Sequence, residues 1–591
     1  MALRYAVIIL AAVAAGAGGF AVAQSQLLAQ TQNVAQNQTQ PPAPKKAASK
    51  TGEQAPRDAQ TGYGSYLAGR FAQMRGDSKQ SIEFFRRVLK DDPNNVDVER
   101  RLLALLVSEG RVDEALPMAK KLADLPVDPD EDDGNLAALT IAISDVKAGR
   151  FAAAETRLAA FPKSGLSTIE GPLFKAWTQA GQKKYDDAVK SLTAEGGNDG
   201  FTVLFGAHAA AINELAGRAE AAEKGYLQSV EGRQRSNLRL TQLLGNFYER
   251  TNRAADARKL YDQYMSDNPG STMLSVPYKR LDSKTVPKPE IANAADGLAE
   301  ALFSLAGSVQ QQSGFQAIIF ARLATYIRSD FSIAKLLIAE ILEGDKRNED
   351  AIGIYRTVLS DPNYSWAARL RIADQFDLLE LPDDAIKELK QMSADEPKRY
   401  DALVRMGDIL RRHKRFEEAT KAYNDAKARI PALGKEHWPM LYASGIAFER
   451  TKQWDKAEAD FLKALEFDPE QPYVLNYLGY SWVEQGKNLD KARGMIELAV
   501  KKRPRDGYII DSLGWVLYRL GDMEGAVRNL ERAVSLRPED PTINDHLGDI
   551  YWKVNRKDEA RFQWKRALSL DPEKDDVPKI QKKLQDGLPE T

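Results

Sequence analysis

The chain has 591 residues, of which 43% are hydrophobic and 28% are charged, and its 83 basic and 84 acidic residues leave a formal net charge of -1. This balance gives no indication of nucleic acid or another polyanion as a partner. The sequence has 0 cysteines and 4 histidines, which excludes disulfides, thiolate metal sites, a cysteine nucleophile and a lipid anchor on an N-terminal cysteine.

The first 23 residues have the pattern of an export signal. Arg4 supplies a positive charge, an apolar run follows from Ala6 to Phe20, and Ala21-Val22-Ala23 matches the small-x-small pattern that signal peptidase cuts. Residues 1–23 are therefore predicted to be a signal peptide, with Gln24 first after cleavage. The alternative is an uncleaved membrane anchor from Tyr5 to Ala23, and only then do we expect contact with a membrane.

Residues 24–61 differ in composition from the rest of the chain. They are rich in glutamine, proline, alanine and lysine and have few large apolar side chains. Such a stretch buries too little apolar surface to offset the entropy of ordering it, so we predict a disordered linker.

From residue 62 onward, a small residue recurs near the start of every second predicted helix, most often at a spacing of 34 residues. The series is Ser81, Ala115, Ala154, Ala188, Ala222, Ala257, Ala317, Ala351, Ala385, Ala419, Ala457, Ala492, Ala526 and Ala560. Each member predicts one pair of helices, so the chain is expected to contain about fourteen pairs.

Glycines and prolines recur with the same period in the C-terminal half. The glycines are Gly445, Gly479, Gly514 and Gly548, and the prolines are Pro469, Pro504, Pro538 and Pro572. Small residues let two antiparallel helices approach closely, and proline ends a helix and sets the turn into the next pair. The period and these residue types resemble the tetratricopeptide repeat, which implies an all-α, right-handed superhelix, or α-solenoid.

The spacing also predicts how the chain is divided. An N-terminal block of more divergent repeats covers 62–269, a linker or hinge covers 270–296, and a C-terminal block covers 297–572. The remainder, 573–591, is predicted to be a capping helix and tail, with Lys579, Lys582 and Lys583 facing outward.

Catalytic and metal-binding motifs are not found in the sequence. It has no HExxH, GxSxG or phosphate-binding glycine loop. The segment Asp128–Gly134 resembles the start of a calcium loop, but its glycine comes one residue late and Leu139 stands where the loop needs glutamate. Gly196–Gly200 is read as a turn. We therefore expect a protein that is not an enzyme and has no metal or cofactor.

A binding surface is predicted on the first helices of the last five repeats. In tetratricopeptide domains these helices line the concave side, and their positions not used for packing contact ligands. The resemblance places there Asp408, Arg411, Arg412, Tyr442, Arg450, Tyr473, Asn476, Tyr480, Asp511, Trp515, Tyr518, Arg519, Asp545, Asp549 and Trp552. Tyrosine, tryptophan and arginine are enriched at interface hot spots, although some of these aromatic side chains could instead fill gaps between repeats.

The C-terminal segments also resemble a group of exported tetratricopeptide proteins of Gram-negative bacteria. The segments that carry this resemblance are Asn476–Tyr480, Leu489–Ala492, Asp511–Gly521, His546–Trp552 and Asp558–Arg561. Some members are lipoprotein adaptors that deliver cell-wall hydrolases to a carboxyl-terminal processing protease. The resemblance implies a periplasmic scaffold or adaptor, with a periplasmic protease or cell-wall enzyme as partner. An alternative location is the inner membrane, facing the periplasm. An alternative function is assembly of an envelope secretion or polysaccharide export complex.

Overall fold

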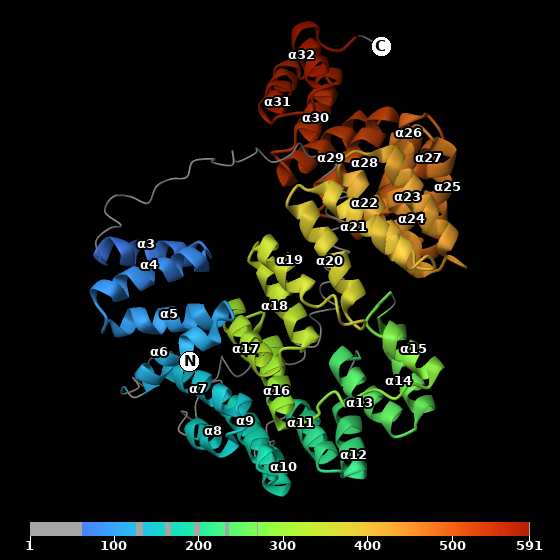
Figure 1. The fold of residues 1–591 in the computed structure, drawn as a ribbon. Coiled ribbons are helices and arrows are strands. Elements are labelled where there is room, and N and C mark those ends of the chain that lie inside the picture. The colour runs from blue at the N-terminus through green and yellow to red at the C-terminus, as the bar shows by residue number, and fades with distance from the viewer. Residues whose placement is uncertain are drawn as a thin grey trace. The chain divides into compact units, whose positions relative to one another are not determined.

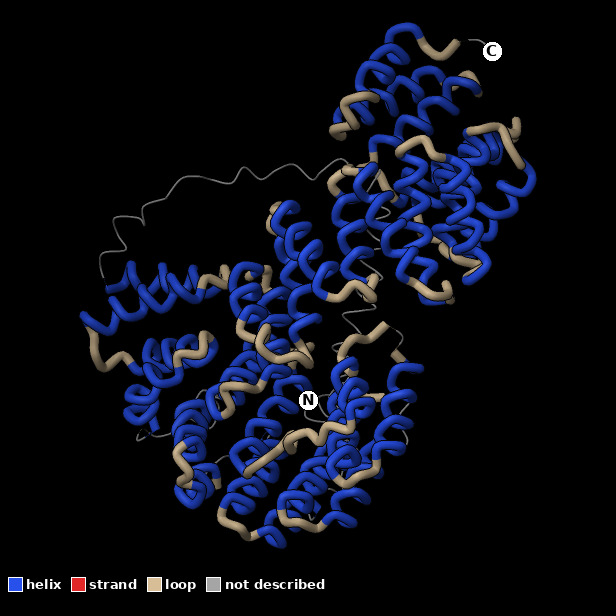
Figure 2. Tube along the Cα trace, turned by 45° about the vertical axis from the view of Figure 1, so that its right-hand side comes forward, coloured by secondary structure: helices blue, strands red, loops and turns tan. Residues whose placement is uncertain are grey.

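The computed structural model describes residues 62–123, 125, 134–159, 167–193, 201–230, 236–268 and 270–589. Within these ranges the chain forms α-helices and one short 3-10 helix, and no β-strand occurs in them (Figure 2). The predicted signal peptide (1–23) and linker (24–61) lie outside the described residues, as do residues 128–133 and Gly196–Gly200. The chain divides into two compact units, one ending at Leu381 and the other beginning at Pro382, and each is described by itself.

The first unit contains helices α3 to α20 (Figure 1). Their bounds are α3 (Gly62–Met74), α4 (Ser78–Asp91), α5 (Val96–Ser108), α6 (Val112–Ala123), α7 (Gly134–Lys147), α8 (Phe151–Leu158), α9 (Ser167–Gly181), α10 (Tyr185–Thr193), α11 (Thr202–Leu215), α12 (Ala219–Val230), α13 (Leu238–Arg250), α14 (Ala254–Asp267), α15 (Ser275–Ser283), α16 (Ala294–Val309), α17 (Gly314–Ile327), α18 (Ser332–Gly344), α19 (Asn348–Arg356) and α20 (Ser365–Leu378).

The second unit contains helices α21 to α32 and the 3-10 helix η3. Their bounds are α21 (Pro382–Asp395), α22 (Asp401–Arg412), α23 (Phe416–Arg429), η3 (Lys435–His437), α24 (Trp438–Arg450), α25 (Trp454–Phe467), α26 (Pro472–Glu484), α27 (Leu489–Lys502), α28 (Gly507–Arg519), α29 (Met523–Leu536), α30 (Pro541–Lys553), α31 (Lys557–Ser569) and α32 (Val577–Asp586).

Within each unit, the recurring small residues lie where the two helices of a pair meet, whereas the predicted partner of α21, which carries Ala385, is α20 of the other unit. Every one of them, from Ser81 on α4 to Ala560 on α31, is on the second helix of its pair and is 0% exposed. The glycine on the first helix faces a large side chain of the second. A Cβ at Gly445 would lie 2.6 Å from Phe461. The two helices of such a pair therefore lie closer together than larger residues at these positions would permit. The predicted all-α solenoid of stacked helix pairs is confirmed.

In the first unit, α16 and α17 lie inside the arc formed by the N-terminal pairs (Figure 1). Helix α16 packs against α9 and α11, and α17 packs against α5 and α7. A Cβ at Gly297 of α16 would lie 2.1 Å from the Trp177 ring of α9. The Trp177 indole N–H donates to Nδ1 of His208 at 3.2 Å, and burial lowers the pKa of His208 to about 4. The chain's own helices therefore cover the inner face of these N-terminal pairs.

Charged contacts also join the later helices of the first unit to its first pairs. Arg347, just before α19, donates to both carboxylate oxygens of Glu109 at 2.7 and 3.0 Å. Arg322 of α17 donates to the Ser108 carbonyl at 3.1 Å. Glu109 and Ser108 lie at the end of α5, so these bonds hold α17 and α19 beside a helix more than two hundred residues earlier in the chain.

The stretch 270–296, predicted as a linker or hinge, is packed into the first unit. It contains α15, whose Arg280 donates to both carboxylate oxygens of Glu249 at 2.9 and 2.8 Å. The Lys288 carbonyl accepts a bond from the Asn246 amide at 2.8 Å. Two residues of this stretch are thus bonded to α13, and the division between the two compact units falls between α20 and α21.

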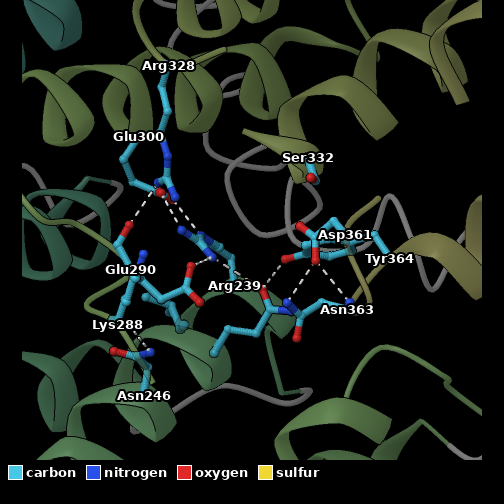
Figure 3. A network of polar contacts seen from close by, with 12 residues as sticks. Arg239, Asn246, Lys288, Glu290, Glu300, Arg328, Ser332, Asp361, Asn363 and Tyr364 are labelled. Atoms are coloured by element: carbon cyan, nitrogen blue, oxygen red, sulfur yellow. Dashed lines mark hydrogen bonds and ion pairs between the residues drawn. The ribbon is translucent and has the colours of Figure 1, made fainter. Parts of the chain in front are cut away.

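Figure 3 shows the polar network that holds this stretch against α13 and α16. The Arg239 guanidinium donates to the two carboxylate oxygens of Glu300 at 2.9 and 2.7 Å and to Glu290 at 2.8 Å. Arg328 donates to the Glu290 carbonyl at 2.8 Å. Burial alone would raise the pKa of Glu300, but the adjacent guanidinium keeps that pKa below its ordinary value. The buried ion pair therefore fixes α16 on α13.

The second unit ends in the predicted capping helix, α32. Ile580 is 1% exposed and joins the apolar core of the unit. Lys579 and Lys582 are exposed, as predicted. Lys583 is turned inward instead, because Asp545 and Asp549 of α30 each bind its ammonium group at 2.8 Å.

Candidate functional site

All of the predicted binding residues lie on the first helices of the second unit. They are Asp408, Arg411 and Arg412 on α22; Tyr442 and Arg450 on α24; Tyr473, Asn476 and Tyr480 on α26; Asp511, Trp515, Tyr518 and Arg519 on α28; and Asp545, Asp549 and Trp552 on α30. Helix α22 contacts α24, and α28 contacts both α26 and α30. We call the surface that these five helices present the first-helix face.

Five of the predicted residues are buried within the unit. They are Asp408, Arg411, Tyr473, Asp511 and Asp549, all at most 8% exposed. Tyr423 of the second helix α23 donates to Asp408 at 2.8 Å, and Arg411 donates to the same hydroxyl at 3.4 Å. Trp564 of α31 donates to Asp549 at 2.8 Å. These polar groups stabilise helix pairs, so the binding prediction rests on the remaining residues.

An aromatic cluster lies where α24 meets α26. Tyr442 makes an edge-to-face contact with Tyr477, with ring centroids 6.1 Å apart, and Phe461 of α25 lies 5.2 Å from Tyr477. The Tyr477 hydroxyl donates to Glu449 at 3.1 Å. Tyr442 thus serves in part to fill the gap between repeats, which is the alternative left open for the aromatic residues of this face.

A second cluster is built around Trp515 on α28. Its ring stacks on His546 of α30 with centroids 4.4 Å apart and an interplanar angle of 22°. Its indole N–H donates to Glu484 of α26 at 2.6 Å, and Arg519 lies 3.4 Å from the same carboxylate. Tyr518 lies 5.3 Å from Trp515. Trp515 is only partly buried, so the edge of this cluster remains accessible.

His546 carries a positive charge at neutral pH. Its Nδ1 lies 3.0 Å from each carboxylate oxygen of Asp511. Burial lowers the pKa of His546, but the charge and hydrogen bonds of Asp511 outweigh this effect and raise the pKa to about 9. The ion pair links α28 to α30 behind Trp515.

Tyr480 and Asn476 of α26 lie next to these clusters and are partly exposed. Burial, followed by the carboxylates of Glu484 and Asp511, raises the pKa of Tyr480, so its hydroxyl stays protonated. The side-chain oxygen of Asn476 is buried and accepts no hydrogen bond from any described residue. An unsatisfied buried acceptor is unfavourable unless a donor reaches it.

The face is covered at its C-terminal end. A Cβ at Gly587 would lie 2.0 Å from the Trp552 ring, so the backbone after α32 rests directly on this indole. Lys553 donates to the Pro589 carbonyl at 2.9 Å. Asp545 is held by Lys583. Away from this end, the predicted residues that remain partly or fully exposed are Arg412, Tyr442, Arg450, Asn476, Tyr480, Trp515, Tyr518 and Arg519. The last five lie together on the neighbouring helices α26 and α28.

Sequence reasoning missed three residues that order this surface, namely Tyr477, Glu484 and His546, which pairs with Asp511. A sequence signal for them exists, because Arg519 follows Glu484 by 35 positions and His546 follows Asp511 by 35 positions. Residues one repeat apart occupy matching positions on neighbouring first helices. Opposite charges at that spacing therefore indicate an ion pair across the face.

Metal-binding and membrane-spanning features are not found in the described ranges. Nowhere in them do three or more histidine, aspartate or glutamate side chains gather as a metal site would require. Among the helices α3 to α32, none combines the length and the apolar character needed to cross a bilayer.

Family models match three segments of the second half of the chain. The tetratricopeptide repeat is matched at residues 376–433 and 542–574, and the TPR repeat at 514–555. These segments overlap the helix pairs α22/α23, α28/α29 and α30/α31. The second half of the chain therefore contains tetratricopeptide repeats, which typically form interaction scaffolds.

The chain is also similar in part to one curated protein and to solved structures. A TPR repeat-containing protein of Pseudomonas aeruginosa is 27% identical over 149 residues, which are 25% of this chain and 25% of that protein. A solved chain of the APC/C hetero-tetramer Cut9–Hcn1 is 14% identical, with a TM-score of 0.36, over 89% of this chain and 96% of its own. A tetratricopeptide repeat protein from Parabacteroides merdae is 15% identical, with a TM-score of 0.36, over 43% and 99%. These two likenesses concern the helical fold alone.

Proposed function

We propose that this scaffold binds an extended segment of a partner protein on the first-helix face between α26 and α28. The observation that carries the proposal is the row of partly exposed Tyr480, Trp515 and Tyr518 beside the exposed Arg519. Tyrosine, tryptophan and arginine are the side chains most enriched at interface hot spots. In the first unit, by contrast, α16 and α17 already occupy the inner face of the N-terminal pairs.

The chemistry of the row favours a segment with its backbone exposed. Asn476 is partly exposed and its buried side-chain oxygen has no donor among the described residues, so rotation of this side chain on binding would let the oxygen accept from a peptide N–H. Trp515 is held by Glu484 and His546, so binding loses little side-chain entropy there.

A photo-crosslinking amino acid in place of Arg519, introduced in the cell, tests the proposal. We expect it to attach a partner protein that is not attached from Phe562, an exposed side chain on α31. Asn476→Ala should weaken capture of that partner about ten-fold, since about 1–2 kcal/mol of hydrogen-bond energy is lost. Asn529→Ala, on the second helix α29, is the matched control. Equal crosslinking from both positions, or capture unaffected by Asn476→Ala, would contradict the proposal.

We further propose that the protein works outside the cytoplasm, in the periplasm, as an adaptor for a protease or a cell-wall enzyme. The support is the export pattern of residues 1–23 and the resemblance of the C-terminal segments to envelope proteins. Sequencing the N-terminus of the protein from cells should find Gln24, together with recovery in the periplasmic fraction. A chain that starts at Met1 in the cytoplasmic fraction would contradict this location.

A further inference from the structure

Helix α3 lies at the N-terminal end of the first unit (Figure 1). An apolar stripe along this helix is exposed. Tyr63, Leu67, Phe71 and Met74 are 75%, 50%, 60% and 82% exposed. Their spacing places them on one side of the helix. Helix α3 contains a single charged residue, Arg70, whose guanidinium donates to the Tyr66 hydroxyl at 3.3 Å. The stripe is therefore an exposed apolar surface, and at its C-terminal end the Arg75 guanidinium lies 5.7 Å from the Phe71 ring centroid.

The same positions are buried on a first helix inside the solenoid. Counted from the glycine of each helix, Leu67 and Phe71 correspond to Leu243 and Phe247 of α13, which are 7% and 4% exposed. Phe247 lies 6.1 Å from Tyr226 of the preceding helix α12. The stripe on α3 is thus the surface on which a preceding helix would pack, and no described residue covers it.

The adjoining sequence is poorly suited to cover the stripe. Residues 35–61, which precede α3, contain no leucine, isoleucine, valine, methionine, phenylalanine, tyrosine or tryptophan. Stacking of one copy's N-terminal end on another copy's C-terminal end is also disfavoured. The outward side of α32 consists of exposed polar residues, among them Lys579, Gln581 and Lys582. An apolar stripe finds no complementary surface there.

We propose that two copies of the chain dimerise by packing their α3 stripes against each other across a two-fold axis. An isologous contact requires a self-complementary surface, which an apolar stripe provides. A two-fold axis perpendicular to α3 makes the two helices antiparallel, so the Arg75 side chain that lies over Phe71 in each copy is at the opposite end of the contact from its counterpart. Because the contact is closed, it yields dimers and not filaments. The stripe is smaller than a standard interface, so we expect a dissociation constant in the micromolar range.

Sedimentation velocity of the purified full chain over a wide concentration range tests this proposal. The expected result is a reversible shift from the mass of one chain, 65.6 kDa before any processing, to twice that mass. Phe71→Glu and Leu67→Glu should each raise the dissociation constant at least ten-fold. Phe562→Glu is the matched control, since Phe562 is 61% exposed and Phe71 is 60% exposed. Far-UV circular dichroism verifies that each variant is folded.

Three outcomes would overturn the proposal. The first is a chain that stays monomeric at every concentration. The second is self-association that is unchanged by the stripe substitutions, or that continues beyond a dimer. The third is a dimer lost when Leu27 and Leu28 are replaced by serine, because the contact would then involve the segment before residue 35 and not a second α3.

Discussion

Glycine is required at several positions where helices meet face to face, and Gly297 is the tightest such contact inside the first unit. A Cβ there would lie 2.1 Å from a Trp177 ring that is 0% exposed and bonded to His208. The ring has no free space into which to move, so an added methyl group must push α16 away from α9.

We therefore predict that Gly297→Ala destabilises the first unit by about 1–3 kcal/mol, the usual range for overpacking a core. Chemical denaturation followed by circular dichroism measures the change. The matched control is Gly353→Ala on α19, where a Cβ would have nothing within 4 Å. It should be neutral or stabilising by up to about 1 kcal/mol, because alanine favours a helix. Equal stability of the two variants would contradict this account of α16.

His546 makes the stability of the second unit depend on pH. The pKa of His546 is raised from 6.5 to about 9 in the folded protein by Asp511. A histidine whose pKa is higher in the folded than in the unfolded state stabilises the folded state, and this contribution is complete at pH values below the pKa of the unfolded state. The contribution is lost as the pH rises through the pKa of the folded state.

We predict that the free energy of unfolding of the second unit falls by at most about 3 kcal/mol between pH 6.5 and pH 9, because His546 loses its proton. Denaturation at both pH values should show the loss in the wild-type chain, and His546→Gln should remove it. Titration of the His546 ring by NMR should give a pKa well above 6.5. A ring that titrates at or below that value would refute the ion pair with Asp511.

At the scale of single elements, α16 covers the inner face of the N-terminal helix pairs. It is held inside their arc by its contacts with α9 and α11 and by the buried ion pair of Glu300 with Arg239. The inner face of the N-terminal pairs is thereby a packing surface within the first unit.

Glu300→Ala should destabilise the first unit by about 3 kcal/mol, because it leaves the buried Arg239 guanidinium with only Glu290 as a charged partner. Denaturant midpoints provide the measurement. Glu114→Ala, in the same unit, removes the exposed ion pairs with Arg86 and Arg111 and should change stability by less than about 1 kcal/mol. If the two substitutions had equal effects, Glu300 would not be holding α16 in place.

At the scale of the whole molecule, the two compact units have separate apolar cores. The core cluster of the first unit runs from Ile82 to Ile372, and clusters of the second lie between Leu441 and Ile580. Stacked repeats contact chiefly their neighbours, so a block with enough pairs and a terminal cap can fold by itself.

We predict that a fragment comprising residues 382–591 folds without the first unit. It should be helical by circular dichroism and unfold cooperatively in denaturant, at a midpoint that matches one transition of the full chain. The complementary fragment 62–381 should account for another transition. A fragment 382–591 that unfolds without cooperativity would show that the second unit depends on the first.

The sequence by itself determined the helix pairs and their period. The small residues from Ser81 to Ala560 and glycines such as Gly445 report local packing between helices adjacent in the chain, and local packing leaves a regular pattern. For the same reason the predicted binding residues were placed on the correct helices. Their local spacing identifies the first helix of each pair.

Only the tertiary structure decided which of those surfaces are open. Several contacts join elements that are distant in the chain or placed by the curvature of the solenoid. They are those of Arg347 with Glu109, Gly297 with Trp177 and Lys583 with Asp549. Curvature is the sum of small rotations between successive repeats, and no single repeat records that sum in its residues. The covered inner face of the N-terminal pairs and the accessible row around Trp515 both follow from it.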